Sequence, residues 1–217
     1  MDKMNLSLKK QTRNLFMDIF EFVSGYKNHP VLFIGTGLSL RYLRNSFTWE
    51  GLLKYISIEL YGSDEKFYDL KSTVYNAHDG SHNLMELAEI LEKEFNEIAQ
   101  SDRNGKFSAI NQLFYEAGRK GKTLSRFKIF VKKLLTQLDY RVDKADEIET
   151  FKRLSKNISS VVTTNYDRMI EDLIQFQPLI GNEILLSNPY GSIYKIHGCV
   201  NYPEKIILTT NDYNLFF

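Results

Sequence analysis

The sequence predicts an α/β fold in which a parallel sheet is flanked by helices, and three observations support this. Two short apolar runs, at residues 31–34 and 158–163, each end at a turn that opens a helical pattern. Between these runs lies a long stretch with helical spacing and no continuous apolar run. Strands that alternate with helices are typical of parallel sheets covered by helices.

Composition places this fold in an ordinary globular protein. At 217 residues the chain is long enough to bury a substantial core. Its formal net charge of +1 produces no strong field, so we expect no membrane partner and no direct binding of nucleic acid. Cys199 is the only cysteine, which favours a reducing, cytoplasmic location. The sequence contains neither a signal-peptide pattern nor a run of 18 apolar residues.

Helical spacing predicts the first elements on either side of the opening strand. An amphipathic helix is expected before that strand, ending near Gly25. Its apolar stripe consists of Leu15, Phe16, Ile19, Phe20 and Val23. The first strand, 31–34, is apolar throughout and is expected to be buried on both faces. A further helix is predicted over residues 48–60, with Trp49 on its inner face.

Residues 63–149 are predicted to form a helical insertion. Asn83 precedes an apolar helical stripe and is followed three positions later by Glu86, a pattern close to a capping box. The glutamates of this stretch and its cations from Arg119 to Lys133 are expected to form solvated helix faces, with a stripe that binds nucleic acid or docks a partner as the alternative. Residues 1–62 and 150–217 would then form the sheet-containing part.

The second strand, 158–163, is followed by a helix with Met169, Ile170 and Leu173 at helical spacing. Three further strands are predicted at 183–186, 192–196 and 205–208, because each run is bounded by Gly, Asn or Pro. The chain ends on an apolar run at 214–217. Because such an ending would be awkward in solvent, we expect the chain to be truncated within a helix.

The first candidate site is the turn Gly35, Thr36, Gly37, Leu38 and Ser39, directly after the first strand. Glycines allow backbone N–H groups to approach a phosphate closely, and a serine adds a hydroxyl donor. This arrangement is Rossmann-like, although Leu40 stands where a dinucleotide fingerprint has its third glycine. The alternative is a plain turn between a strand and a helix.

The second candidate site is the turn Thr163 to Asp167 after the other strand. Ligands bind at the carboxyl ends of parallel strands, so this turn and the glycine turn are expected to line one crevice. Asn165 offers both a donor and an acceptor for a ribose hydroxyl or a water molecule. In the alternative interpretation, Thr164 caps the following helix with Asp167 as its partner.

The third candidate site is His197, which an apolar strand places immediately before Gly198. Histidine can accept a proton near neutral pH, and the glycine would leave space for a ligand beside the ring. The alternative is a purely structural histidine.

These three sites, in this order, resemble the sirtuin (SIR2) family. Its members carry a Gly-Ala-Gly-x-Ser loop, a Thr-x-Asn-x-Asp turn and a Leu-His-Gly strand end, similar to 35–39, 163–167 and 196–198 here. The segment 47–53 is similar to a Trp-x-x-Leu-Leu helix of bacterial SIR2-like proteins, and 202–213 resembles their hairpin and Asp-Tyr element. Thr36 departs from the usual alanine. The last part of the family's sheet is missing from this sequence, so the resemblance implies a sheet that is incomplete at its C-terminal end.

The four-cysteine zinc module of protein-deacylating sirtuins is absent, so we expect no bound metal and disfavour deacylation. The helical stretch in its place resembles bacterial antiphage SIR2 effectors, which hydrolyse NAD during abortive infection. The resemblance implies NAD as substrate, with Asn165 and His197 catalytic. The implied NAD-binding residues are Gly35, Thr36, Gly37, Leu38, Ser39, Thr164, Asp167 and Gly198.

The resemblance also implies partners and leaves alternatives open. Related proteins assemble into oligomers and are fused to or paired with sensor modules, so we expect a homo-oligomer with such a sensor. The main alternative is a non-catalytic module that binds NAD or ADP-ribose as a sensor. A second alternative is an assembly domain in which the pocket no longer acts.

Overall fold

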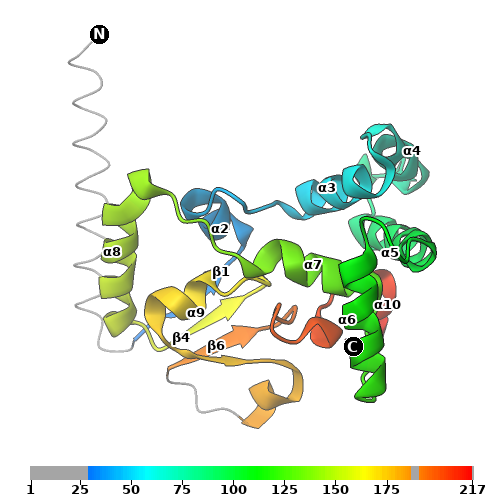
Figure 1. The fold of residues 1–217 in the computed structure, drawn as a ribbon. Helices are drawn as coiled ribbons and strands as arrows, with labels where there is room; N and C mark the ends of the chain where they lie inside the picture. The colour runs from blue at the N-terminus through cyan, green and yellow to red at the C-terminus, as the bar shows by residue number, and fades with distance from the viewer. Residues whose placement is uncertain (1–28, 187–190, 217) are drawn as a thin grey trace.

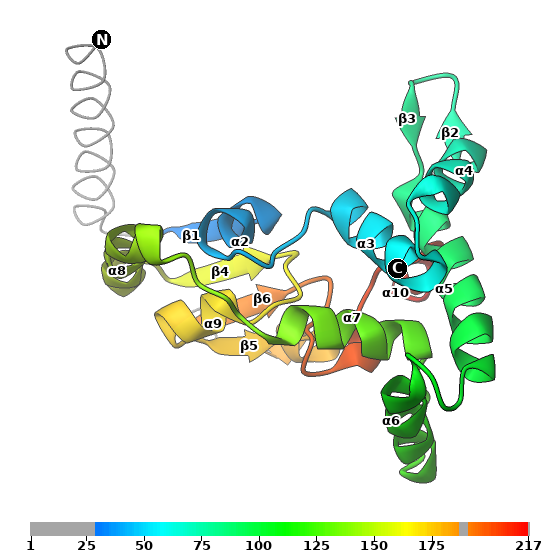
Figure 2. The ribbon, with the colours of Figure 1, turned by 45° about the horizontal axis from the view of Figure 1, so that its top comes forward.

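The structure is a computed structural model that describes residues 29–186 and 191–216 (Figure 1). It combines a parallel sheet with a separate layer of helices, and both views place this layer beyond the carboxyl ends of the strands (Figures 1 and 2). The helix predicted from the stripe at Leu15 to Val23 lies outside the described residues. In the part of the chain that is described, no helix is long and apolar enough to cross a bilayer.

The sheet contains four parallel strands in the order β1-β4-β6-β5. Ile34 of the first strand is aligned with Thr163 of the second, which in turn is aligned with Lys195 of the third. Strands β1, β4 and β6 confirm three predicted strands, and the sheet with its flanking helices confirms the Rossmann-like α/β prediction. The strand bounds are β1 (Val31–Ile34), β4 (Ser160–Thr163), β6 (Ser192–Lys195) and β5 (Gln177–Leu179).

Strand β5 was not predicted, because it is only three residues long and contains Pro178. Within the described residues it lies at the edge of the sheet and pairs only with β6. Proline, which has no N–H to donate, is tolerated at such an edge.

Two predicted strands are wrong. Residues 183–186 belong instead to the 3-10 helix η3 (Gly181–Leu186), which follows a turn at Gly181 with φ of 61°. Residues 205–208 follow η4 (Pro203–Lys205) as an extended segment outside the sheet. The apolar run there is explained by packing, since Ile206 and Leu208 are buried in the helical layer.

The prediction that the first strand is buried on both faces is also wrong. Leu32 and Ile34 pack toward the helices, whereas Val31 and Phe33 are 57% and 72% exposed. Alternate residues of a strand point to opposite faces, so among the described residues only one face of β1 meets helices. This face packs against α2 (Thr36–Tyr42), α8 (Ala145–Leu154) and α9 (Met169–Ile174).

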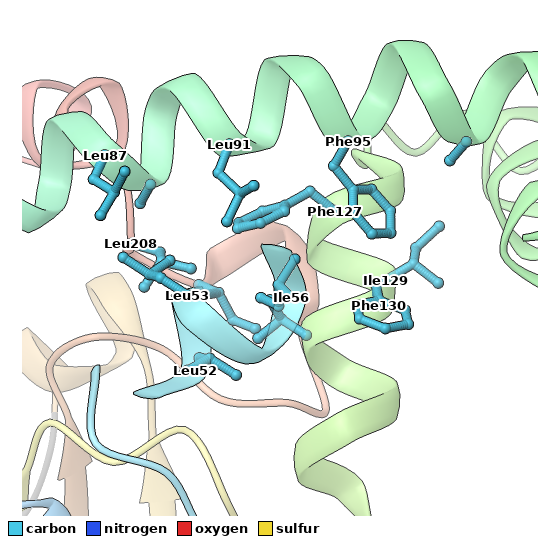
Figure 3. Close-up of a cluster of buried hydrophobic side chains, with 14 of the residues drawn as sticks. Leu52, Leu53, Ile56, Leu87, Leu91, Phe95, Phe127, Ile129, Phe130 and Leu208 are labelled. Carbon is cyan, nitrogen blue, oxygen red and sulfur yellow. The ribbon is translucent and has the colours of Figure 1, made fainter. Parts of the chain in front are cut away.

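The helical layer has its own hydrophobic core, in which Phe95 and Phe127 lie among leucine and isoleucine side chains (Figure 3). Two predicted helix starts are confirmed: Thr48 Oγ1 accepts from Gly51 N at 2.9 Å, and Asn83 Oδ1 accepts from Glu86 N at 3.2 Å. The helices are α3 (Trp49–Tyr61), α4 (Glu65–Thr73), α5 (Leu84–Ser101), α6 (Ser108–Arg119) and α7 (Arg126–Thr136). An exposed hairpin of β2 (Tyr75–Asn76) and β3 (Ser81–His82) joins α4 to α5.

The segment after β6 connects the sheet to this helical layer. Lys128 of α7 donates to the Ile206 carbonyl at 2.9 Å and forms a 2.5 Å ion pair with Asp212. Asp212 lies on α10 (Thr210–Phe216), which packs against α5. The core of the helical layer also includes side chains of α3, which lies before residue 63. The bounds of the helical insertion, residues 63 and 149, stay a prediction.

Candidate active site

The turn after β1 presents its backbone to open space. Gly35 precedes the first turn of α2, and a Cβ atom at Gly35 or Gly37 would meet nothing within 4 Å. Packing within the protein therefore does not require either glycine. Leu38 packs against the core of the sheet, which leaves only its backbone for a ligand. Ser39 is buried at 1% exposure and points into the protein.

Asn165 connects this turn to the end of β4. Its amide nitrogen donates to the Gly35 carbonyl at 3.1 Å and to Ser39 Oγ at 3.0 Å. The side chain is only 2% exposed, and its carbonyl oxygen Oδ1 is buried without a hydrogen-bond partner among the described residues. A buried polar atom without a partner is costly, so it marks a place where a ligand or water would bind.

Asp167 completes a directed network with the same serine. Ser39 Oγ donates to Asp167 Oδ2 at 2.8 Å, and Met169 N donates to Asp167 Oδ1 at 3.0 Å. The single hydroxyl proton of Ser39 is thus used, and its oxygen can only accept from Asn165. The N-cap position of α9 is Arg168, which makes no side-chain capping hydrogen bond, so the predicted capping by Thr164 is wrong. Asp167 accepts from Met169 N just before the helix, and Thr164 makes no side-chain hydrogen bond within the described residues.

Lys195 and Glu171 form a buried ion pair beside this network, which the sequence reasoning missed. Lys195 is fully buried, its Nζ lies 2.7 Å from Glu171 Oε1, and it also donates to the Asp167 backbone carbonyl. The other Glu171 oxygen is buried without a partner among the described residues, and Cys199 Sγ lies 3.9 Å from Oε1. The only signal was that Lys195 stands between Tyr194 and Ile196, whereas Glu171 is followed by a second acidic residue and gives no such signal.

Replacement of Lys195 by methionine is expected to destabilise the fold by about 3–5 kcal/mol, because it leaves the Glu171 carboxylate buried and unpaired. The double variant Lys195→Met/Glu171→Leu removes both charges and is expected to regain most of that free energy. Urea denaturation of the three proteins measures this. Equal loss in the single and double variants would contradict the pairing.

His197 follows β6 in a turn and contacts α10. Its Nε2 atom lies 3.2 Å from the Tyr213 hydroxyl, and the two rings meet edge to face at 5.5 Å. Burial lowers the pKa of His197 below its ordinary value. Gly198 has φ of 85°, and a Cβ atom there would lie 2.2 Å from the Lys205 carbonyl oxygen. The close approach of the Lys205 backbone therefore explains the glycine at position 198. That backbone fills the space that was expected to hold a ligand.

Strand register places the three turns at one edge of the sheet. Gly35 lies one residue beyond the aligned set Ile34, Thr163 and Lys195, while Asn165 and His197 each lie two residues beyond it. Side-chain hydrogen bonds join Gly35, Ser39, Asn165 and Asp167 directly. His197 sits at the neighbouring strand end, and no hydrogen bond links it to Asn165 among the described residues.

One family of known proteins is similar to the C-terminal part of the chain. A model of the family described as SIR2-like domain matches residues 159–217, which include the Asn165 and His197 turns. The glycine turn lies outside the matched segment, but Asn165 and Asp167 are bonded to it. No curated protein matches the chain significantly. No group of three or more potential metal ligands occurs in residues 29–186 and 191–216. Residues 159–217 are therefore similar to a SIR2-like domain, and this likeness points to an NAD-related function.

Proposed function

We propose that this domain hydrolyses NAD at the bond between nicotinamide and ribose. The observation that carries the proposal is the buried, unpartnered Oδ1 atom of Asn165, held at the carboxyl ends of β1 and β4. A water molecule or a ribose hydroxyl would supply the donor that this atom lacks.

The hydrogen bonds around Asn165 also determine which way its amide faces. The Gly35 carbonyl has no proton, and Ser39 has already given its own to Asp167, so both can only accept. The amide nitrogen must therefore face them, which leaves Oδ1 to accept from the substrate. The site holds this acceptor before the substrate arrives, as preorganised catalysis requires.

The reaction separates the nicotinamide from the ribose by breaking one C–N bond. The bonding electrons leave with the nicotinamide nitrogen, which neutralises its positive charge, and the ribose carbon becomes oxocarbenium-like. Water then adds to that carbon, and His197 accepts the proton that is released. The products are nicotinamide, ADP-ribose and a proton.

The other site residues would bind and orient NAD. The backbone from Gly35 to Ser39 would hold the diphosphate, because its glycines face open space. Asp167 would orient the nicotinamide amide, while Thr164 and Gly198 would line the pocket through their backbone. The Lys195–Glu171 pair would keep the Asp167 turn in place.

Incubation of the purified protein with NAD tests the proposal directly. We expect nicotinamide and ADP-ribose to appear in equal amounts. NAD binding detected by calorimetry without any nicotinamide after hours of incubation would favour the non-catalytic sensor instead.

The pH dependence of the reaction is expected to reflect the buried environment of His197. Burial lowers the pKa of this imidazole, so its neutral, basic form persists to lower pH than in solution. The acid limb of kcat/KM, which reports the free enzyme, is therefore expected to have its midpoint below about 6.5. Steady-state rates between pH 5 and 8 measure it, and a midpoint above that value would contradict this assignment.

The resemblance to bacterial antiphage effectors extends the proposal to the cell. There the domain would act in the cytoplasm as a homo-oligomer, under the control of a fused or separate sensor, and would deplete NAD in infected cells. NAD measured after phage challenge is expected to fall in cells that express the active protein. It is expected to stay constant in cells that express the Asn165→Ala variant.

A further inference from the structure

Tyr213 makes the only side-chain hydrogen bond to the His197 ring among the described residues. Its hydroxyl lies 3.2 Å from Nε2, and the edge-to-face geometry of the rings orients the imidazole. The other ring nitrogen, Nδ1, has no hydrogen-bond partner in the described part of the chain. One nitrogen is thus held and the other is free for a substrate.

Tyr213 is itself fixed from two sides. Its ring stacks on Trp49 of α3, with centroids 6.5 Å apart and planes inclined by 28°. The neighbouring Asp212 accepts from the backbone N–H groups of Leu208 and Thr209 and pairs with Lys128 of α7. The helical layer therefore determines where the tyrosine hydroxyl lies.

We propose that Tyr213 is a positioning residue that accepts a hydrogen bond from His197 Nε2–H and so leaves Nδ1 as the basic nitrogen. This inference rests on the proposed function of His197. A base whose second nitrogen is held by an acceptor keeps one tautomer and one orientation, as in catalytic triads. When Nδ1 takes a proton, the bond from Nε2–H becomes charge-assisted and stronger.

The variant Tyr213→Phe removes the oxygen and retains the ring that packs on Trp49. We expect kcat for nicotinamide release to fall about tenfold, the equivalent of one lost hydrogen bond, with KM little changed. The acid limb of the pH profile is expected to move to lower pH, because the variant no longer stabilises the imidazolium. The nearby charges Lys195 and Asp212 are each held in ion pairs, with Glu171 and Lys128.

The matched control is Tyr202→Phe, which alters a half-exposed tyrosine in the same segment, and it is expected to leave both readouts unchanged. A Tyr213→Phe variant with wild-type kcat and an unmoved acid limb would overturn the proposal. A shift of the acid limb to higher pH would also overturn it, since that result means the hydroxyl donates to the ring.

Nitrogen NMR of the His197 imidazole tests the same hydrogen bond without relying on activity. The wild-type protein is expected to show the Nε2–H tautomer, with a higher pKa than in Tyr213→Phe. The Nδ1–H tautomer in the wild-type protein would overturn the inference about Tyr213. A wild-type protein that shows the Nε2–H tautomer but releases no nicotinamide would support the Tyr213 contact and contradict the proposed function.

Discussion

Replacing Asn165 by alanine is expected to reduce nicotinamide release by about 100-fold or more, the range seen when one preorganised hydrogen-bonding group is removed from an active site. The variant loses the Oδ1 acceptor, and it also releases Ser39 and the Gly35 carbonyl from their shared donor. Initial rates at saturating NAD, measured beside the wild-type protein, determine the loss.

Stability must be separated from catalysis in this experiment, because Asn165 is also a buried hydrogen-bonding residue. Asn111 offers a matched control, since it is also 2% exposed and hydrogen-bonded but lies in the helical layer. Unlike Asn165, its amide oxygen has a partner, Arg126. Both alanine variants are expected to lose about 1–3 kcal/mol of stability. If Asn111→Ala lowered the rate as much as Asn165→Ala, the loss would reflect folding and the catalytic role would be refuted.

Replacing His197 by alanine is expected to lower the rate by about 100- to 10,000-fold, the usual contribution of a general base. The loss should appear in kcat, because proton transfer belongs to the chemical step rather than to NAD binding. The acid limb of the pH profile should also disappear, since the group that titrates is gone. Rates from pH 5 to 8 in the variant measure both effects.

The control for this variant is His82→Ala, which removes a histidine from the exposed hairpin. It is expected to keep wild-type activity. A His197→Ala protein that retained the acid limb would show that another group supplies the base.

The strands that carry the site could be predicted because each has a strong local pattern. Val31–Ile34 is apolar throughout, three of the four residues of Ser160–Thr163 are β-branched, and both strands end at clear turns. The order of the strands was not predictable in detail, but parallel pairing alone brings their carboxyl ends to one edge. This is why Gly35, Asn165 and His197 could be assigned to one edge from the sequence.

The missed features depend on contacts between distant residues. The apolar run Ile206 to Leu208 has the composition of a strand, yet the side chains of Ile206 and Leu208 belong to the core of the helical layer. Burial therefore overrode β propensity there. For β1, an apolar sequence indicated two covered faces, whereas Phe33 is largely exposed.

The polar network beside the site was equally hidden in the sequence. Lys195 and Glu171 are 24 positions apart, and no local pattern indicates that a helix would bring the carboxylate to the end of β6. The start of α9 shows the same limit on a smaller scale. The sequence offered Thr164 as a cap, but the helix begins later, after Arg168, and Asp167 accepts from Met169 N instead.

A crystal structure of the His197→Ala variant with NAD tests the central claim most directly, since this variant should bind the dinucleotide and turn it over slowly. We predict that the nicotinamide ribose, or a water molecule beside it, contacts Asn165 Oδ1 and that the diphosphate lies along the backbone from Gly35 to Ser39. NAD bound at another surface, with neither contact present, would contradict the account.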